Sequence, residues 1–168
     1  AGLRVFFNRP EADATRGEDL WRAYLLRALS GYLGEGREGI RTLLDCPAAD
    51  ALAVHGALQD LGSKPVALLD DLDRRLNEEG RFVFVGYDEL DTLGGADNRT
   101  MGFAIQGLIA FWASYARRWK RIRPKIFIRT DLFRRHAGLG GSDLAKLAAN
   151  RAELTWSDRN LYAMLLKR

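Results

Sequence analysis

Residues 81–93 read Arg-Phe-Val-Phe-Val-Gly-Tyr-Asp-Glu-Leu-Asp-Thr-Leu and follow a Glu-Glu-Gly turn signal at residues 78–80. Residues 82–85 are all aromatic or β-branched. A short apolar run bounded by turn residues is typical of a parallel strand buried on both faces. Asp88 and Glu89 follow where the strand should end, and ligands of open α/β sheets bind at the carboxyl ends of parallel strands. The alternative interpretation is a core strand that runs into an acidic turn capping a helix.

The composition is that of an ordinary globular protein. The 168 residues are 47% apolar and 29% charged, which fits one domain with a sizeable core and excludes a disordered chain. The single cysteine, Cys46, excludes an internal disulfide and a Cys-rich zinc site, and it fits a reducing compartment. The longest apolar stretch, residues 102–116, is interrupted by Gln106 and is too short to span a membrane. We therefore expect a cytoplasmic protein that does not interact with membranes.

The first half of the chain is predicted to be mainly helical. An apolar run indicates a strand at Leu3–Phe7, and apolar spacing predicts helices over 18–33, 40–44, 50–61 and 65–77. The last of these helices carries Asp70, Asp71 and Asp73 at helical spacing, so these acids are predicted to form a solvated helix face.

The second half alternates strands and helices. Residues 99–119 are apolar most of the way round, which is typical of a helix covered by other structure. Residues 125–131 form a second apolar strand with a polar end. Shorter helices over 132–137 and 142–148, a strand at 151–155 and a closing helix from Trp156 follow. This order predicts a three-layer α/β sandwich around a mostly parallel sheet.

These segments resemble the nucleotide-binding core of P-loop ATPases, most closely the bacterial STAND/KAP type. Phe82–Asp91 is similar to the family's apolar run followed by Asp-Glu-Leu-Asp, the Walker B motif. Lys125–Asp131 resembles the family's next strand with its polar "sensor" end. Leu154–Ser157, with Leu161 and residues 165–168, is similar to the closing strand and helix. The resemblance covers residues 81–168, and the first half matches more loosely.

The resemblance implies an ATP and Mg²⁺ site for ATP hydrolysis coupled to signalling, defence or assembly. Asp88 would hold Mg²⁺ through water, and Glu89 would activate the attacking water. Arg129 or Thr130 would contact the γ-phosphate or the water, although a salt bridge or cap at a strand end is the alternative for both. Two further acids are predicted to cap turns rather than bind ligands: Asp91 after Leu90, and Asp131 before the helix at Leu132.

The sequence departs from the family in one respect. It contains no G-x-x-x-x-G-K-[ST] motif, because the glycine-rich stretches at 31–39 and 138–141 lack the Gly-Lys-[Ser/Thr] ending. The chain also opens on Ala1-Gly2-Leu3 without an initiator Met. We expect the P-loop and its strand to lie upstream of Ala1, and the fragment alone to bind ATP poorly. The alternative is a non-catalytic, degenerate P-loop scaffold or binding module.

Residues 117–125 carry six basic residues among nine, with Trp119 between them, in a chain of net charge +4. Such a cluster is suited to nucleic-acid phosphates. Of the two interpretations we favour a solvated helix end that leads into a strand, where cations suit the helix dipole. In a homo-oligomer, the cluster could instead offer an arginine to a neighbour's nucleotide.

Overall fold

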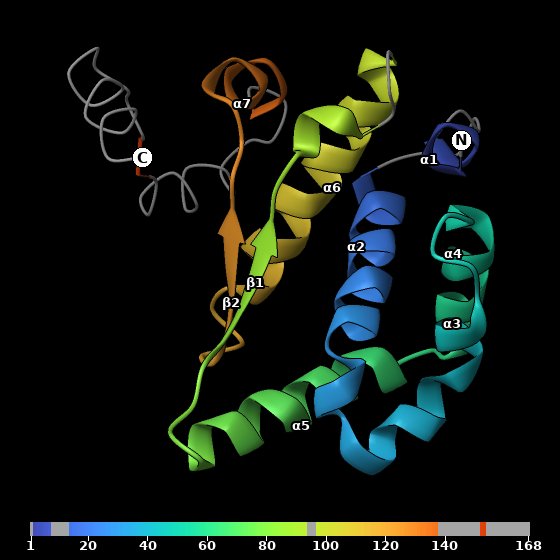
Figure 1. Ribbon diagram of the computed structural model, residues 1–168, viewed down its shortest axis with the longest axis vertical. Helices are drawn as coiled ribbons and strands as arrows, with labels where there is room; N and C mark the ends of the chain where they lie inside the picture. Colours follow the sequence, from blue (N-terminus) through green and yellow to red (C-terminus); the bar gives the residue numbers. More distant parts are fainter. Residues whose placement is uncertain (1, 8–13, 94–96, 138–151, 154–168) are drawn as a thin grey trace, which may run out of the picture.

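The computed structural model describes residues 2–7, 14–93, 97–137 and 152–153, in which helices surround one small parallel sheet (Figure 1). The α-helices are α1 (Gly2–Phe7), α2 (Ala14–Ala28), α3 (Arg41–Asp45), α4 (Ala51–Asp60), α5 (Lys64–Glu78), α6 (Asn98–Tyr115) and α7 (Thr130–Ala137). Three 3₁₀ segments are η1 (Ser30–Tyr32), η2 (Gly34–Ile40) and η3 (Leu90–Thr92), and the strands are β1 (Val83–Tyr87) and β2 (Ile122–Ile126).

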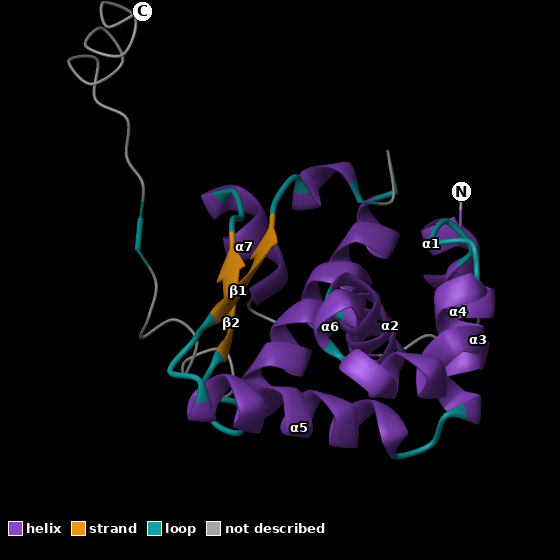
Figure 2. Cartoon of the chain, turned by 60° about the horizontal axis from the view of Figure 1, so that its bottom comes forward, coloured by secondary structure: helices purple, strands orange, loops and turns teal. Residues whose placement is uncertain are grey.

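Helix α6 is the centre of the molecule. The strand pair lies on one side of it and α2 on the other, while α5 runs along one end of the assembly (Figures 1 and 2). Ten α6 residues are buried, among them Leu108, Phe111 and Trp112. This confirms the prediction of a largely covered helix, and it explains why its apolar residues go most of the way round.

Helices α2 and α6 cross with their backbones in contact. A Cβ built on Gly107 would lie 2.5 Å from the Gly17 Cα and 2.6 Å from the Gly17 carbonyl carbon, so only glycine fits at this crossing. One turn further along α2, the Trp21 indole Nε1 donates a 2.7 Å hydrogen bond to the Ala104 carbonyl of α6. The Trp21 ring also meets the Tyr87 ring edge-on, with centroids 5.5 Å apart. The crossing therefore fixes both helices against the end of β1.

Strands β1 and β2 pair in parallel, with α6 as the crossover between them and with Val83 opposite Ile122. The prediction that β1 is buried on both faces was wrong, because exposure alternates along the strand and Phe84 is 59% exposed. Val83, Val85 and Tyr87 pack against the core, whereas no described element covers the opposite face. The chain has α/β character, but its two described strands do not form the predicted three-layer sandwich.

Leu3–Phe7, predicted to be a strand, belongs to helix α1. Phe6 and Phe7 are both fully buried, with their rings 4.9 Å apart, and α1 packs against α4 and α6. A helix makes backbone hydrogen bonds within its own segment, whereas a strand needs a neighbouring strand, and the main contacts of α1 are with helices rather than with β1 or β2. The helix at 142–148 and the closing helix from Trp156 lie outside the described residues. So does most of the strand at 151–155, whose described residues 152 and 153 form no strand.

Two acids of α5 hold the chain that leads into β2. The buried Asp73 carboxylate accepts hydrogen bonds from the backbone N–H groups of Lys120, Arg121 and Ile122, at 3.0, 2.7 and 2.9 Å. Asp70 accepts from the guanidinium of Arg118 through both oxygens, and from the Trp119 indole at 2.9 Å. Hydrogen bonding to Arg118 holds the pKa of Asp70 below its ordinary value.

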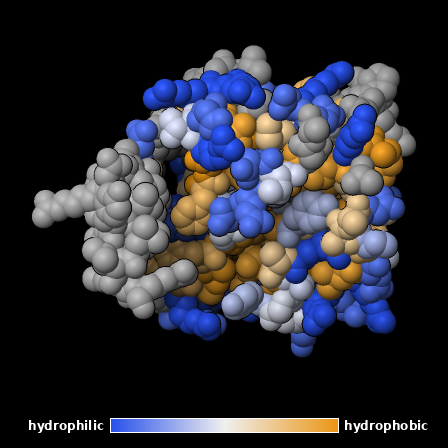
Figure 3. All heavy atoms as spheres, turned by 45° about the horizontal axis from the view of Figure 1, so that its top comes forward, coloured by the Kyte–Doolittle hydropathy of each residue, from blue (hydrophilic) through white to orange (hydrophobic). Residues whose placement is uncertain are grey.

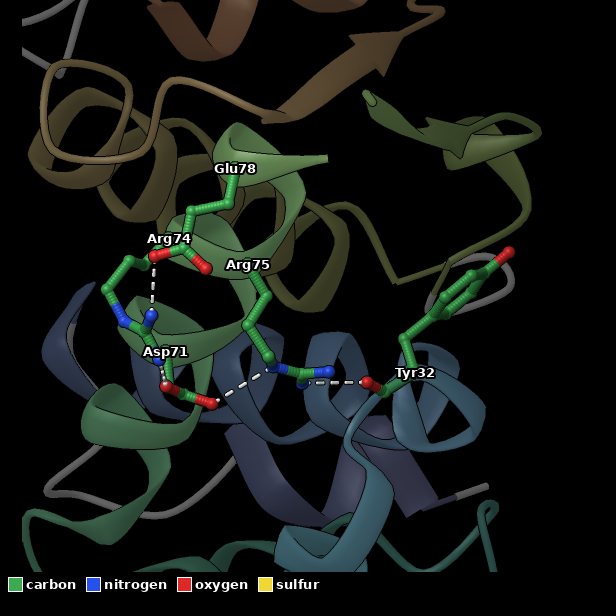
Figure 4. Close-up of polar contacts among 5 residues, drawn as sticks. All are labelled: Tyr32, Asp71, Arg74, Arg75 and Glu78. Atoms are coloured by element: carbon green, nitrogen blue, oxygen red, sulfur yellow. Dashed lines mark hydrogen bonds and ion pairs between the residues drawn. The ribbon is translucent and has the colours of Figure 1, made fainter. Parts of the chain in front are cut away.

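Only one of the three α5 acids fits the solvated helix face expected from the sequence. Asp71 pairs with Arg74, which also reaches Glu78, and with Arg75, whose Nη2 donates to the Tyr32 carbonyl at 2.9 Å (Figure 4). All of these side chains are substantially exposed. Asp70 and Asp73 instead anchor the segment before β2, so the prediction was wrong for them.

None of the described helices combines the length and the apolar character that a membrane span requires.

Candidate functional site at the carboxyl edge of the strand pair

The predicted site residues lie at one edge of the sheet, where β1 and β2 both end. Figure 3 turns this end of the molecule toward the viewer and shows hydrophilic side chains interspersed with apolar surface. The pairing continues to the edge, since the Phe127 N–H donates to the Tyr87 carbonyl at 2.8 Å. Because the strands are parallel, Asp88 and Glu89 follow β1 at the same edge of the sheet at which Arg129 and Thr130 follow β2.

Tyr87, the last residue of β1, anchors this edge in the core. Its ring meets the Trp112 ring of α6 edge-on, with centroids 6.2 Å apart, as well as the Trp21 ring of α2. Burial raises the pKa of Tyr87 to about 12, although the Trp112 side chain acts in the opposite direction. Asp88 and Glu89 are therefore exposed acids that directly follow a residue whose side chain is packed in the core.

The backbone at Glu89 is held in a left-handed conformation, with φ 55° and ψ 32°. Glu89 is the one non-glycine residue with positive φ among the described residues. The Asp88 Oδ1 accepts from the Glu89 N–H at 2.8 Å, and the Glu89 carbonyl accepts from the Thr92 N–H and hydroxyl at 3.0 and 2.8 Å. Such a conformation costs about 1–3 kcal/mol and persists only where the surroundings impose it.

The Glu89 carboxylate is exposed and forms no ion pair or hydrogen bond within the described part of the chain. On Asp88, which is exposed, only Oδ1 has a partner among the described residues. Neither acid forms an ion pair with a cation in the part of the chain that the structure describes. Both therefore remain available to a ligand.

Arg129 links the two strand ends through acids other than Asp88 and Glu89. Its guanidinium pairs with both Asp131 oxygens at 3.1 and 3.2 Å, and its Nη1 lies 3.5 Å from the Asp91 Oδ2. The hydrogen bonds from Arg129 to Asp131 raise the pKa of the guanidinium. Desolvation acts to raise the pKa of Asp131, but Arg129 and the N–H of Leu132 hold it below its ordinary value.

The edge differs from the sequence prediction in the role of Asp91. The sequence indicated a turn cap, but Asp91 lies in η3 and reaches across to Arg129 on the neighbouring strand. Asp131 also pairs with Arg129, in addition to its predicted capping contact with Leu132. Thr130 begins α7 and is half-buried. A salt bridge at a strand end, which the sequence left open for Arg129, is what the structure contains.

The basic segment 117–125 is not a helix end, because α6 ends at Tyr115 and the segment runs through a turn into β2. Trp119 is 1% exposed and stacks on Tyr115, with centroids 4.5 Å apart. Arg118 is neutralised by Asp70. Arg121 and Lys125 instead lie over the rings of Phe82 and Phe84 on the uncovered face of the sheet.

Metal binding at the edge would have to rely on few protein ligands. Within the described residues, no three or more His, Cys, Asp or Glu side chains form a group that could hold a metal ion. A Mg²⁺ ion bound with a nucleotide keeps several waters and often takes only one or two carboxylates, so Asp88 alone is compatible with that arrangement.

Comparison with protein-family models, curated proteins and solved structures gives no significant match.

Proposed function

We propose that this chain supplies the acidic half of a Mg²⁺–ATP site in a P-loop-type ATPase core. One observation carries the proposal: Asp88 and Glu89 are exposed at the carboxyl end of a strand paired in parallel, with the Arg129 guanidinium at the end of the neighbouring strand. Ligands of parallel α/β sheets bind at this edge.

Asp88 and Glu89 have distinct proposed roles. The free Oδ2 of Asp88 would accept a hydrogen bond from a water on Mg²⁺, while its Oδ1 fixes the Glu89 backbone. The Glu89 carboxylate would orient and deprotonate the water that attacks the γ-phosphate. The left-handed backbone of Glu89 supports this role, because it fixes the direction in which the side chain leaves the backbone, and the carboxylate has no partner among the described residues.

Arg129 would act only after a change of partners. Its guanidinium now faces Asp131 and Asp91, and a γ-phosphate would compete with these carboxylates for the same donors. Thr130, beside it at the start of α7, would contact the phosphate or the water. Exchange of an arginine between carboxylates and phosphate would couple nucleotide binding to the position of α7, as a signalling or assembly switch requires.

The residues fit the metal and the water but not the phosphates. A P-loop surrounds the phosphates with backbone N–H groups and a lysine, and the sequence contains no Gly-Lys-[Ser/Thr]. The proposal therefore requires a phosphate-binding loop from a segment outside these 168 residues. A scaffold without catalysis would need neither the strained Glu89 backbone nor two exposed acids that form no ion pair with the described residues at this edge.

The test uses the complete protein that contains these residues. Glu89→Gln is expected to lower ATP turnover by about 100-fold or more, because general-base catalysis contributes about 10²–10⁴-fold. ATP affinity should change little, since the amide keeps the size and position of the side chain. Glu35→Gln, at an exposed glutamate of η2, is the matched control and should leave turnover unchanged.

Turnover of Glu89→Gln within about twofold of wild type would rule out the base assignment. A complete protein that binds no Mg²⁺–ATP would rule out the site and favour the scaffold.

A further inference from the structure

The uncovered face of the two-stranded sheet, here called the open face, combines aromatic rings with cations. Strand alternation places Phe84 and Gly86 of β1 on the same side as Arg123 and Lys125 of β2. Phe82 and Phe127 extend this surface beyond the strands. Phe82, Phe84 and Phe127 are 52%, 59% and 51% exposed, and they are three of the five large apolar side chains exposed to this degree among the described residues.

The rings and cations of the open face are organised together. The Phe82 and Phe84 rings stack, with centroids 6.1 Å apart and planes 17° from parallel. The Arg121 guanidinium lies 4.5 Å from the Phe82 centroid, and the Lys125 ammonium lies 5.3 Å from the Phe84 centroid. A cation over a ring face is attracted to it, so these contacts pre-organise both partners.

The described residues of the open face include no acid. Arg121 donates to the Asn77 side-chain oxygen, and Arg123 donates to the carbonyls of Ala116 and Lys120, so neither guanidinium is paired with a carboxylate in the described structure. Lys125 is exposed and likewise has no described ion pair. The positive charge of this surface is therefore not neutralised from within.

We propose that the open face binds single-stranded nucleic acid, with bases stacked on the phenylalanine rings and phosphates paired with Arg121, Arg123 and Lys125. A single strand offers base faces that can stack on these rings together with negative charge that can pair with these cations. A base-paired duplex hides its base faces and exposes only edges in its grooves. A purely apolar protein layer would bury three cations without a compensating negative charge, which is costly. The proposal does not depend on the nucleotide site at the carboxyl edge.

The proposal is tested by titrating the 168-residue chain into fluorescein-labelled dT₂₀ or rU₂₀ at KCl concentrations between 50 and 300 mM. The fluorescence anisotropy of the labelled oligonucleotide measures binding. Three phosphate contacts predict a slope of log Kobs against log [KCl] of about −2, at about 0.7 per contact for single strands. Phe84→Ala should weaken binding by about fivefold or more with the slope kept, because loss of one stacked base costs about 1–3 kcal/mol. Lys125→Gln should instead make the slope less steep by about 0.7.

The matched controls are Tyr32→Ala on η1 and Arg37→Gln on η2, an exposed aromatic ring and an exposed cation outside the sheet. Both should bind like wild type. The proposal is overturned by absence of binding at 50 mM KCl, by binding that salt does not weaken, or by equal loss in Phe84→Ala and Tyr32→Ala. Sedimentation showing a dimer that Phe84→Ala dissociates, without oligonucleotide binding, would assign the open face to a second copy of the chain and also overturn it.

Discussion

Gly107→Ala is expected to lower the free energy of unfolding by about 3 kcal/mol or more. The added Cβ would lie 2.5 and 2.6 Å from backbone atoms of Gly17, and backbone cannot turn aside as a side chain can. Overpacking of a tight core costs about 1–3 kcal/mol and occasionally more. The gain in helix propensity, about 1 kcal/mol, is too small to offset the separation of α2 from α6.

Urea denaturation followed by circular dichroism measures this loss. Gly56→Ala is the control, because Gly56 also lies inside a helix but has nothing within 4 Å of its built Cβ. That variant should gain about 0.5–1 kcal/mol from helix propensity alone. If Gly107→Ala were as stable as Gly56→Ala, the α2–α6 crossing would not be as close as described.

Asp73→Ala is expected to cost about 3 kcal/mol as well. The substitution removes a buried carboxylate that accepts three backbone N–H groups, from residues 120–122, and it leaves these donors without partners at the start of β2. Hydrogen bonds to a charged group contribute about 1.5–3 kcal/mol, and each unsatisfied buried donor costs about 1–3 kcal/mol. Partial access of water to residues 120 and 121 keeps the total below the sum of these values.

The control for Asp73→Ala lies two residues away on the same helix. Asp71→Ala breaks only exposed ion pairs with Arg74 and Arg75, so it should cost less than about 1 kcal/mol. The same urea titration compares the two variants. Equal losses would mean that Asp73 does not anchor the segment before β2.

Local signals predicted the middle helices well. Apolar spacing located α4 and α5, and Pro65 in the first turn of α5 and Asp50 at the start of α4 lie where such residues favour helix starts. At α4, the Asp50 side chain accepts from the Ala53 N–H. These features are visible in the sequence because each acts within one turn of the chain.

The boundary between α6 and β2 could not be predicted in the same way. The apolar pattern predicted that the helix ends at Trp119 and that the strand starts at Lys125. In the structure the helix ends at Tyr115 and the strand starts at Ile122. Asp73 and Asp70, almost 50 residues earlier, capture the backbone and side chains of residues 118–122. The apolar pattern of a short segment cannot indicate contacts with residues so far away in the sequence.

The candidate site was predictable in position but not in detail. An apolar run ending in Asp88-Glu89 places these acids at a strand end, and the second strand brings Arg129 to the same edge of the sheet. Two details depend on the conformation of η3, which no residue type in the motif specifies. They are the left-handed backbone of Glu89 and the ion pair between Asp91 and Arg129.

The most direct test of the proposed Mg²⁺–ATP site is the Mg²⁺ dependence of ATP binding by the complete protein, compared between wild type and Asp88→Asn. We predict that Asp88→Asn raises the Mg²⁺ concentration needed for half-maximal binding by about 10–100-fold, the usual effect of losing a carboxylate that acts through a metal-bound water. Asp60→Asn, at an exposed aspartate that ends α4, should behave like wild type. An unchanged Mg²⁺ requirement in Asp88→Asn would contradict a metal–nucleotide site at this edge.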